Sequence, residues 1–336
     1  AWLIVKTTGL PWWGMGAIVL FLNAVLGVRM WYVPRKEPPP IWFERYWVWG
    51  YFAVAVSCMY GAVFALVAWW WDWSDPGIGI GLSCCAALGL YGVGFPWRRV
   101  VVRRVDVPIL ALPPDFNDYR IAHISDLHAG PMSPEWRLKS WVRRVNKLKP
   151  DLVLITGDMV ATGSAFVPSL ERSLAMLESP SRVVACMGNH DYFGQADEAI
   201  RAMYKRLGIE LLCNSHTNIV SASGSSSLVL AGVDDTWQGN NDLGKAMDGA
   251  RTDLPVLLLS HDPRVFEEVV EQEDYPIALQ FSGHTHGGQL AVPFLGRATS
   301  VLSIFGVAWS QGLYERHQRW LHVSAGLGTT GAPVRI

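Results

Sequence analysis

Five short motifs rich in Asp, Asn and His are spread along residues 125–288 of this 336-residue chain. They read Ser125-Asp126-Leu127-His128, Gly157-Asp158, Gly188-Asn189-His190-Asp191, Ser260-His261-Asp262 and Gly283-His284-Thr285-His286-Gly287-Gly288. Each motif directly follows a short apolar segment. The side chains of the five motifs can form one site only if the apolar segments before them end close together in space. This requirement constrains the fold more than composition does.

Short apolar segments alternate with amphipathic ones from about residue 105 onward, a rhythm typical of an α/β fold. We expect strands at 119–124, 152–156, 183–187, 227–233, 256–260, 277–281 and 320–323, and helices at 134–148 and 167–177. In open α/β sheets the functional side chains follow the carboxyl ends of the strands. We therefore expect all five motifs to converge on one edge of the sheet structure.

The side chains of the motifs combine hard oxygen donors with imidazole nitrogens, a mixture that suits a pair of divalent transition metals. A two-metal centre activates water for attack on phosphorus. Histidines outside the motifs are more often structural than ligating. We interpret four histidines in this way, namely His123, His216, His317 and His322.

The ordered motif set D-x-H, G-D, G-N-H-D, H and G-H-x-H resembles the calcineurin-like metallophosphoesterase superfamily over about residues 118–336. The stretches Gly287-Gly288-Gln289 and 326–335 resemble a branch of membrane-associated bacterial phosphodiesterases related to enzymes that act on UDP-2,3-diacylglucosamine. The resemblance implies a metallophosphoesterase domain over residues 105–336. Its implied fold is an αββα sandwich of two mixed sheets.

The resemblance also implies metal ligands for two divalent ions, with Mn²⁺ foremost and Fe²⁺ or Fe³⁺, Zn²⁺ and Co²⁺ as alternatives. One ion would be held by Asp126, His128 and His286, the other by Asn189, His261 and His284, and Asp158 would bridge both.

Two further residues of the third motif are candidate catalytic residues. His190 follows a ligand candidate but is not needed as a ligand, so it is placed to stabilise the transition state or to protonate the leaving oxygen. Asp191 would orient its surroundings. The implied reaction is attack of a metal-activated hydroxide on phosphorus, with His190 assisting the leaving group.

Residues 10–97 are poor in charge, and residues 1–104, which we predict to be a membrane anchor, are rich in tryptophan. Twelve of the seventeen tryptophans lie before residue 100, as in an aromatic belt at a membrane interface. The apolar runs 10–33, 46–71 and 76–96 are each long enough for a membrane-spanning helix, which takes about 20 residues. We predict an anchor of about three such helices. Buried helices of a soluble protein are the alternative.

Loop charge predicts the orientation of this anchor. The loop after the first run carries Arg29, Arg35, Lys36 and Arg45, and Arg98, Arg99, Arg103 and Arg104 follow the third. Basic loops stay in the cytoplasm, so we expect a protein of the bacterial inner membrane with a cytoplasmic catalytic domain. The basic stretch 98–104 either contacts anionic headgroups or is a plain flank of the last helix.

Composition and motif details exclude several classes of function. A net charge of −1 gives no basic field for nucleic acid. Five cysteines without metal-binding spacing imply no disulfide framework and fit a reducing compartment. Phosphoprotein phosphatases of the superfamily carry Asp-Arg-Gly shortly after the second motif, where this chain has Met159-Val160-Ala161. No obligate protein partner is evident.

Three functions therefore compete. The first is a membrane-bound phosphodiesterase or pyrophosphatase acting on a lipid-linked phosphoester, with membrane lipids as partners. The apolar segment 292–307 would then admit an acyl chain, the alternative being core packing or a hairpin. The second is a tethered hydrolase of soluble or cyclic nucleotides. The third is a membrane scaffold whose site is catalytically silent.

Overall fold

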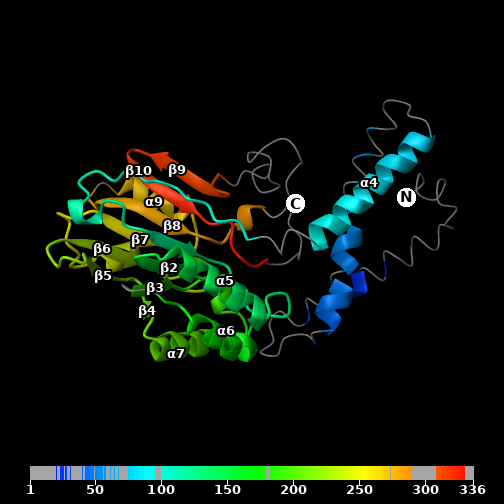
Figure 1. Cartoon of the computed structure of the whole chain (residues 1–336), viewed down its shortest axis with the longest axis horizontal. Helices are drawn as coiled ribbons and strands as arrows, with labels where there is room; N and C mark the ends of the chain where they lie inside the picture. Colours follow the sequence, from blue (N-terminus) through cyan, green and yellow to red (C-terminus); the bar gives the residue numbers. More distant parts are fainter. Residues whose placement is uncertain are drawn as a thin grey trace. The chain divides into compact units, whose positions relative to one another are not determined.

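The computed structural model describes residues 75–94 and 100–329, except for gaps at 179–181, 273 and 289–307, together with separate short stretches between residues 20 and 67 (Figure 1). The chain divides into two compact units. One comprises Ala1–Arg99 with Gly331–Ile336, and the other comprises Val100–Thr330.

The first unit contains a π-helix, η1 (Phe43–Val48), and the long helix α4 (Asp75–Gly94). Glycines let α4 approach its neighbours closely, because a Cβ at Gly81 would overlap the ring of Phe64 and one at Gly89 would overlap Ser57. Within the described residues, no helix combines the length and apolar character needed to cross a membrane. Of the three predicted runs, 10–33 and 46–71 lie largely outside the described residues, whereas 76–96 overlaps α4.

The first sheet of the second unit has the strand order β1-β2-β3-β4, and all its described pairings are parallel. Its strands are β1 (Ile121–Ile124), β2 (Leu152–Thr156), β3 (Arg182–Cys186) and β4 (Glu210–Leu211). Helices α5 (Glu135–Leu148), α6 (Val167–Leu174) and α7 (Asp197–Leu207) connect them. The expectation of two mixed sheets is wrong for this one, because each helical crossover returns the chain in the same direction.

The second sheet is mixed, with the order β5-β6-β7-β8-β10-β9. Its inner strands β6 (Ser227–Gly232), β7 (Val256–Leu259), β8 (Ile277–Ser282) and β10 (Arg319–Val323) are parallel to one another. The edge strands β5 (Ser215–Val220) and β9 (Gly312–Arg316) pair antiparallel. Two short helices, α8 (Leu243–Met247) and α9 (Val265–Glu271), accompany this sheet.

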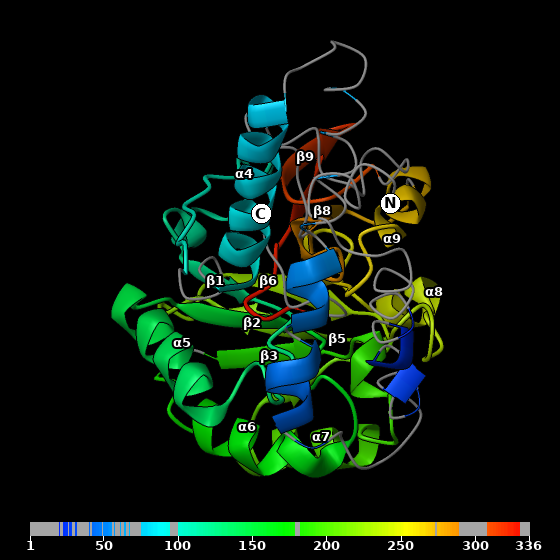
Figure 2. The same cartoon turned by 90° about the vertical axis from the view of Figure 1, so that its right-hand side faces the viewer.

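Alternation along the strands builds four layers. Leu152 and Leu154 of β2 pack between the sheets against residues of β7 such as Leu257, whereas Val153 and Ile155 pack under α5, α6 and α7. Figure 2 shows these three helices on one face of the first sheet. On the far side, Leu258 packs with α8 and α9. A strand covered on both faces needs a continuous apolar run, and β2 is buried throughout. The predicted αββα layering is confirmed.

Most predicted elements are present, with shifts of a few residues at their ends. The predicted strand at 152–156 has the same bounds as β2. The predicted helix at 167–177 ends earlier, at Leu174, and the sequence reasoning did not identify α7, β5 or β9. The parallel strands of both sheets end at the segments that carry the five motifs, and this edge holds the candidate site.

Candidate metal centre

Each motif lies in a tight turn at the end of its strand. Asp126 and His128 follow β1, Asp158 follows β2, and Asn189 and His190 begin a 3₁₀ turn, η5 (Asn189–Asp191), after β3. His261 follows β7, and His284 and His286 follow β8. The predicted convergence on one edge is therefore what the structure has.

The backbone of these turns is strained. Five of the ligand candidates have left-handed φ values, namely Asp126 (54°), His128 (45°), Asp158 (56°), His284 (70°) and His286 (53°). Such conformations cost about 1–3 kcal/mol each and persist where the surrounding structure enforces them. They turn the side chains inward, toward one another.

Glycines let the second and third motifs stack closely. Gly157 has a φ of 79°, and a Cβ there would overlap the backbone of Gly188. A Cβ at Gly188 would in turn overlap the carboxylate of Asp158. The turn at Gly157-Asp158 and the turn at Gly188-Asn189 can therefore approach each other this closely only with glycine at both positions. Their contact brings Asp158 beside Asn189.

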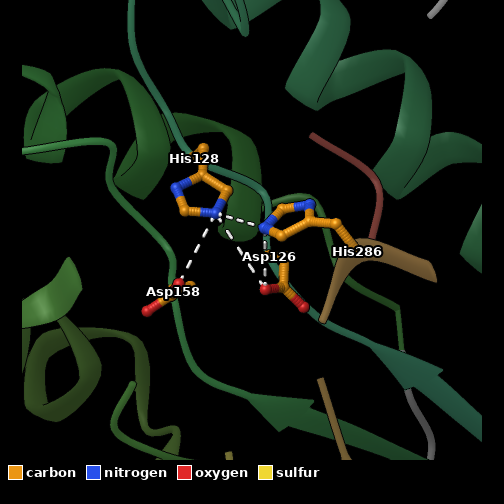
Figure 3. A group of neighbouring side chains, drawn as sticks. All are labelled: Asp126, His128, Asp158 and His286. Carbon is orange, nitrogen blue, oxygen red and sulfur yellow. Dashed lines mark hydrogen bonds and ion pairs between the residues drawn. The ribbon is translucent and has the colours of Figure 1, made fainter. Parts of the chain in front are cut away.

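Four side chains form one cluster of donors, drawn in Figure 3. The candidate ligand atoms of Asp126, His128, Asp158 and His286 all lie within 4.8 Å of one another, and all four residues are buried. His286 Nε2 is 3.2 Å from Asp126 Oδ1 and 3.0 Å from His128 Nε2. Three donors of this cluster are those expected for the first metal, and Asp158 is the expected bridge.

The remaining three ligand candidates lie on the other side of Asp158. His261 Nε2 is 3.3 Å from Asp158 Oδ2, and His284 Nδ1 is 3.1 Å from Asn189 Oδ1. The rings of His261 and His284 are 5.0 Å apart. Since His128 Nε2 is 3.5 Å from the same Oδ2 atom, one carboxylate oxygen faces both histidine groups.

This donor set fits two divalent cations. Among the described residues, the buried Nε2 of His261 makes no well-directed hydrogen bond, although Asp158 Oδ2 lies 3.3 Å away, so this nitrogen is suited to bind a further group. Imidazole, carboxylate and amide oxygen are suitable ligands for Mn, Fe, Zn or Co. A cation bound here would lie against both His128 Nε2 and His286 Nε2, two imidazole nitrogens that face each other at 3.0 Å.

Burial and charge set the protonation of these groups. Burial lowers the pKa of His128, and the neighbouring His190 lowers it further. Burial and the charge of His261 lower the pKa of His284 to about 4. Both imidazoles are then neutral at pH 7, as metal ligands must be. Burial opposes ionisation of Asp158, but His261 holds the pKa of this carboxyl well below its usual value.

Asp191 lies wholly buried beneath the site and does not face it as a donor group. Its Oδ2 accepts backbone N–H bonds from Gly188 and Asp158, both at 3.0 Å, and its Oδ1 accepts one from Met159 at 2.7 Å. The carboxylate thereby ties the turn after β2 to the turn after β3. Burial and then the charge of Asp158 raise its pKa to about 7.

His190 lies beside the first cluster. Its backbone N–H donates to Asp158 Oδ1 at 2.8 Å, and its Nδ1 donates to the carbonyl of Ala161 at 2.7 Å. The ring packs edge-to-face on His128, with centroids 4.6 Å apart.

The structure adds residues that the motifs did not indicate. The backbone carbonyl of Thr156 accepts a 2.6 Å hydrogen bond from His261 Nδ1 and so orients that ring. Trp237 follows β6 and lies 5.1 Å from the ring of His284. A sequence signal existed for this loop, because Asp234-Asp235 directly follows a buried strand, as the other motifs do.

The C-terminal glycine-rich stretch also contacts the site. The backbone N–H of Leu327 donates to the backbone carbonyl of Ser125 at 3.1 Å, and that of Gly328 donates to the backbone carbonyl of Asp126 at 2.7 Å. The apolar segment 292–307, the expected acyl-chain lip, lies outside the described residues.

His123 and His322, interpreted as structural, pair with each other through Nδ1 atoms 2.9 Å apart.

Comparison with known proteins agrees with this site. The calcineurin-like phosphoesterase family model matches residues 119–288, which include all five motifs. The chain belongs to this family, a class of metal-dependent phosphoester hydrolases.

Three relatives illustrate its range. A transmembrane protein with metallophosphoesterase domain from Danio rerio is 30% identical over 266 residues, which cover 76% of this chain and 59% of that protein. The uncharacterized metallophosphoesterase YkuE of Bacillus subtilis is 29% identical, over 67% of this chain and 77% of that protein. The UDP-2,3-diacylglucosamine pyrophosphatase LpxG of Chlamydia trachomatis is 28% identical, over 62% and 78%. The chain thus spans 59% of the length of the Danio rerio relative.

Proposed function

We propose that this chain is a membrane-bound phosphodiesterase or pyrophosphatase that hydrolyses a lipid-linked phosphoester with two divalent metal ions, Mn²⁺ foremost. The observation that carries the proposal is the position of Asp158 Oδ2, which faces His128 at 3.5 Å and His261 at 3.3 Å. A single oxygen between two donor groups is what a bridging ligand requires.

The proposed ligands divide between two ions. Asp126, His128 and His286 would hold one ion, and Asn189, His261 and His284 would hold the other, with Asp158 shared between them. When bound, such ions lower the pKa of a water molecule and offset the charge that builds up on phosphorus. Asn189 contributes a neutral oxygen, which keeps the negative charge of the ligand shell low.

His190 assists departure of the leaving group. Its Nδ1–H bond to the carbonyl of Ala161 fixes the orientation of the ring beside the first cluster. General acid catalysis by a positioned histidine contributes about 10²–10⁴-fold. Asp191 acts through Asp158 and Gly188 rather than on the substrate, and we assign it a positioning role.

Two observations support a lipid-linked substrate at a membrane. The apolar runs 10–33, 46–71 and 76–96 precede the catalytic unit, and the Danio rerio relative carries a transmembrane name. The Chlamydia relative is named for a nucleotide-activated acylated sugar. Tethering at a bilayer raises the effective concentration of such a substrate. The basic loops favour a cytoplasmic catalytic unit at the bacterial inner membrane.

The test uses the full chain purified in detergent. We expect hydrolysis of bis-p-nitrophenyl phosphate with Mn²⁺, and turnover of UDP-2,3-diacylglucosamine in mixed micelles above that of a cyclic nucleotide, with products identified by mass. Asp158→Asn should abolish activity and lower the bound metal, whereas Asp253→Asn, at an exposed surface pair, should change neither. Preferred turnover of the soluble nucleotide would support the tethered nucleotide hydrolase instead. A chain that binds metal and cleaves none of these would support the silent scaffold.

A further inference from the structure

An exposed tryptophan stands at the rim of the metal centre. Trp237 follows β6 and keeps 56% of its surface exposed. Its ring centroid is 5.1 Å from that of the ligand candidate His284, with the two planes at 74°. Its position beside a candidate metal ligand, rather than its exposure alone, puts the indole within reach of a bound substrate.

The loop that carries Trp237 is held firmly. The buried Asp235 accepts backbone N–H bonds from Trp237 at 2.8 Å and from Gln238 at 2.6 Å. Thr236 Oγ1 donates to Asp262 Oδ2 at 2.7 Å, and Asp262 directly follows the ligand candidate His261. The indole is therefore fixed relative to the metal ligands, and binding against it costs little loop ordering.

A cation accompanies the tryptophan. The guanidinium carbon of Arg264 lies 5.7 Å from the centre of the Trp237 ring. Asp262 holds this guanidinium through Nη2 at 2.6 Å and Nε at 3.0 Å, yet the Arg264 side chain stays 61% exposed. The rim thus places a flat aromatic surface beside an exposed guanidinium whose charge Asp262 partly offsets.

We propose that Trp237 and Arg264 form a subsite for the nucleoside end of a nucleoside diphosphate, with Trp237 stacking on the base and Arg264 pairing with a phosphate oxygen. Aromatic side chains stack on any base through its π face. A guanidinium matches phosphate geometry better than an ammonium does. An acyl chain would gain from the indole but would leave the cation unused. The inference rests on the proposed function, because it requires the scissile phosphorus to lie at Asp158.

The test compares two ligands that differ only in the base. Uridine monophosphate and ribose 5-phosphate are titrated calorimetrically into the full chain in detergent with Mn²⁺. We expect the wild type to bind the nucleotide at least about tenfold more tightly, a difference of about 1.4 kcal/mol. Trp237→Leu should reduce this ratio to about one, whereas Trp237→Phe should keep most of it. Because both ligands share the phosphate, the ratio is insensitive to metal loading or partial misfolding.

Two further variants complete the design. Trp136→Leu, at a tryptophan that is 61% exposed on α5, should leave the ratio unchanged. Arg264→Gln should weaken both ligands alike, and an unchanged affinity would overturn the role of Arg264. A wild-type ratio near one, or a ratio that Trp237→Leu leaves intact, overturns the subsite. If the wild type does not hydrolyse bis-p-nitrophenyl phosphate, the proposed function fails instead. The failure of the subsite and the failure of the proposed function are therefore distinguishable.

Discussion

Replacing Asp191 with Asn tests whether this residue positions the site or transfers protons. The carboxylate accepts bonds from Gly188 and Asp158 on one oxygen and from Met159 and Val160 on the other. An amide can satisfy only one of these pairs, and its NH₂ group would face two N–H donors. Each buried donor left unsatisfied costs about 1–3 kcal/mol. The bond to Val160 is long at 3.4 Å, so we take the low end of that range for it and expect a loss of about 3 kcal/mol.

A loss of that size is measurable by thermal unfolding of the purified chain. For a domain of this size, 1 kcal/mol shifts the melting temperature by about 2–4 °C, so Asp191→Asn should lower it by roughly 6–12 °C. Metal content should fall with it, because the turn that carries Asp158 is no longer fixed. Asp242→Asn is the control, since this exposed helix cap accepts one bond, from Lys245, and Asn caps helices equally well. A variant with normal stability and metal content but low kcat would refute the positioning role.

Three further predictions concern the neighbouring histidines and the metals. His190→Asn keeps a donor near the Ala161 carbonyl but loses Nε2, so kcat should fall about 10²–10⁴-fold while the metal content stays unchanged. The loss should be larger for a substrate with an alkoxide leaving group than for one that releases p-nitrophenolate, because the alkoxide needs a proton more. An equal loss for both leaving groups would argue against proton donation. Burial and the neighbouring His322 lower the pKa of His123, and burial also lowers the pKa of His322. Both imidazoles are therefore neutral in the folded protein, and the unfolded chain binds protons more readily below about pH 6.5. The free energy of unfolding should fall as the pH falls below that value, by up to about 1.4 kcal/mol per pH unit for each histidine. The double variant His123→Gln, His322→Asn should show a flatter dependence of melting temperature on pH than the wild type, and parallel curves would contradict this account. Chelation should abolish hydrolysis while leaving the far-ultraviolet circular dichroism spectrum unchanged, because buried strands rather than metals hold the turns in place; unfolding on chelation would contradict this.

The strands that position the site were predictable because their physics is local. Residues 152–155 are apolar without interruption, as a strand covered on both faces must be, and β2 adds only Thr156 to them. Asp158 comes two residues later, so its place at the sheet edge followed directly. The same reasoning placed His261 after β7 and His284 after β8.

The edges of the second sheet were not predictable in this way. β5 reads Ser-His-Thr-Asn-Ile-Val, and β9 ends in two exposed charged residues, Glu315 and Arg316. Edge strands need not be apolar on both faces, so neither segment carries a continuous hydrophobic signal. Strand direction in the first sheet was also missed, because it depends on three helical crossovers, one of which, α7, was not identified.

Roles that depend on tertiary contacts were beyond the motifs. The sequence places Asp191 next to a ligand candidate, which suggested catalysis, but only the structure shows its carboxylate turned toward four backbone N–H groups. Trp237 lies 47 positions before His284 in the chain, and nothing local links the two. Their contact arises because β6 and β8 end at the same edge.

The strained turns explain why this edge is suited to metal chemistry. Five ligand candidates hold left-handed backbone conformations, at about 1–3 kcal/mol each. That strain is sustained by the sheets behind it and by fixed bonds such as those of Asp191, so it is present before any ligand arrives. A site whose backbone is fixed in advance loses little conformational freedom when it binds a ligand. Within the described part of the chain, Nε2 of His261 illustrates this constraint, because it lies 3.3 Å from Asp158 Oδ2 without a well-directed hydrogen bond.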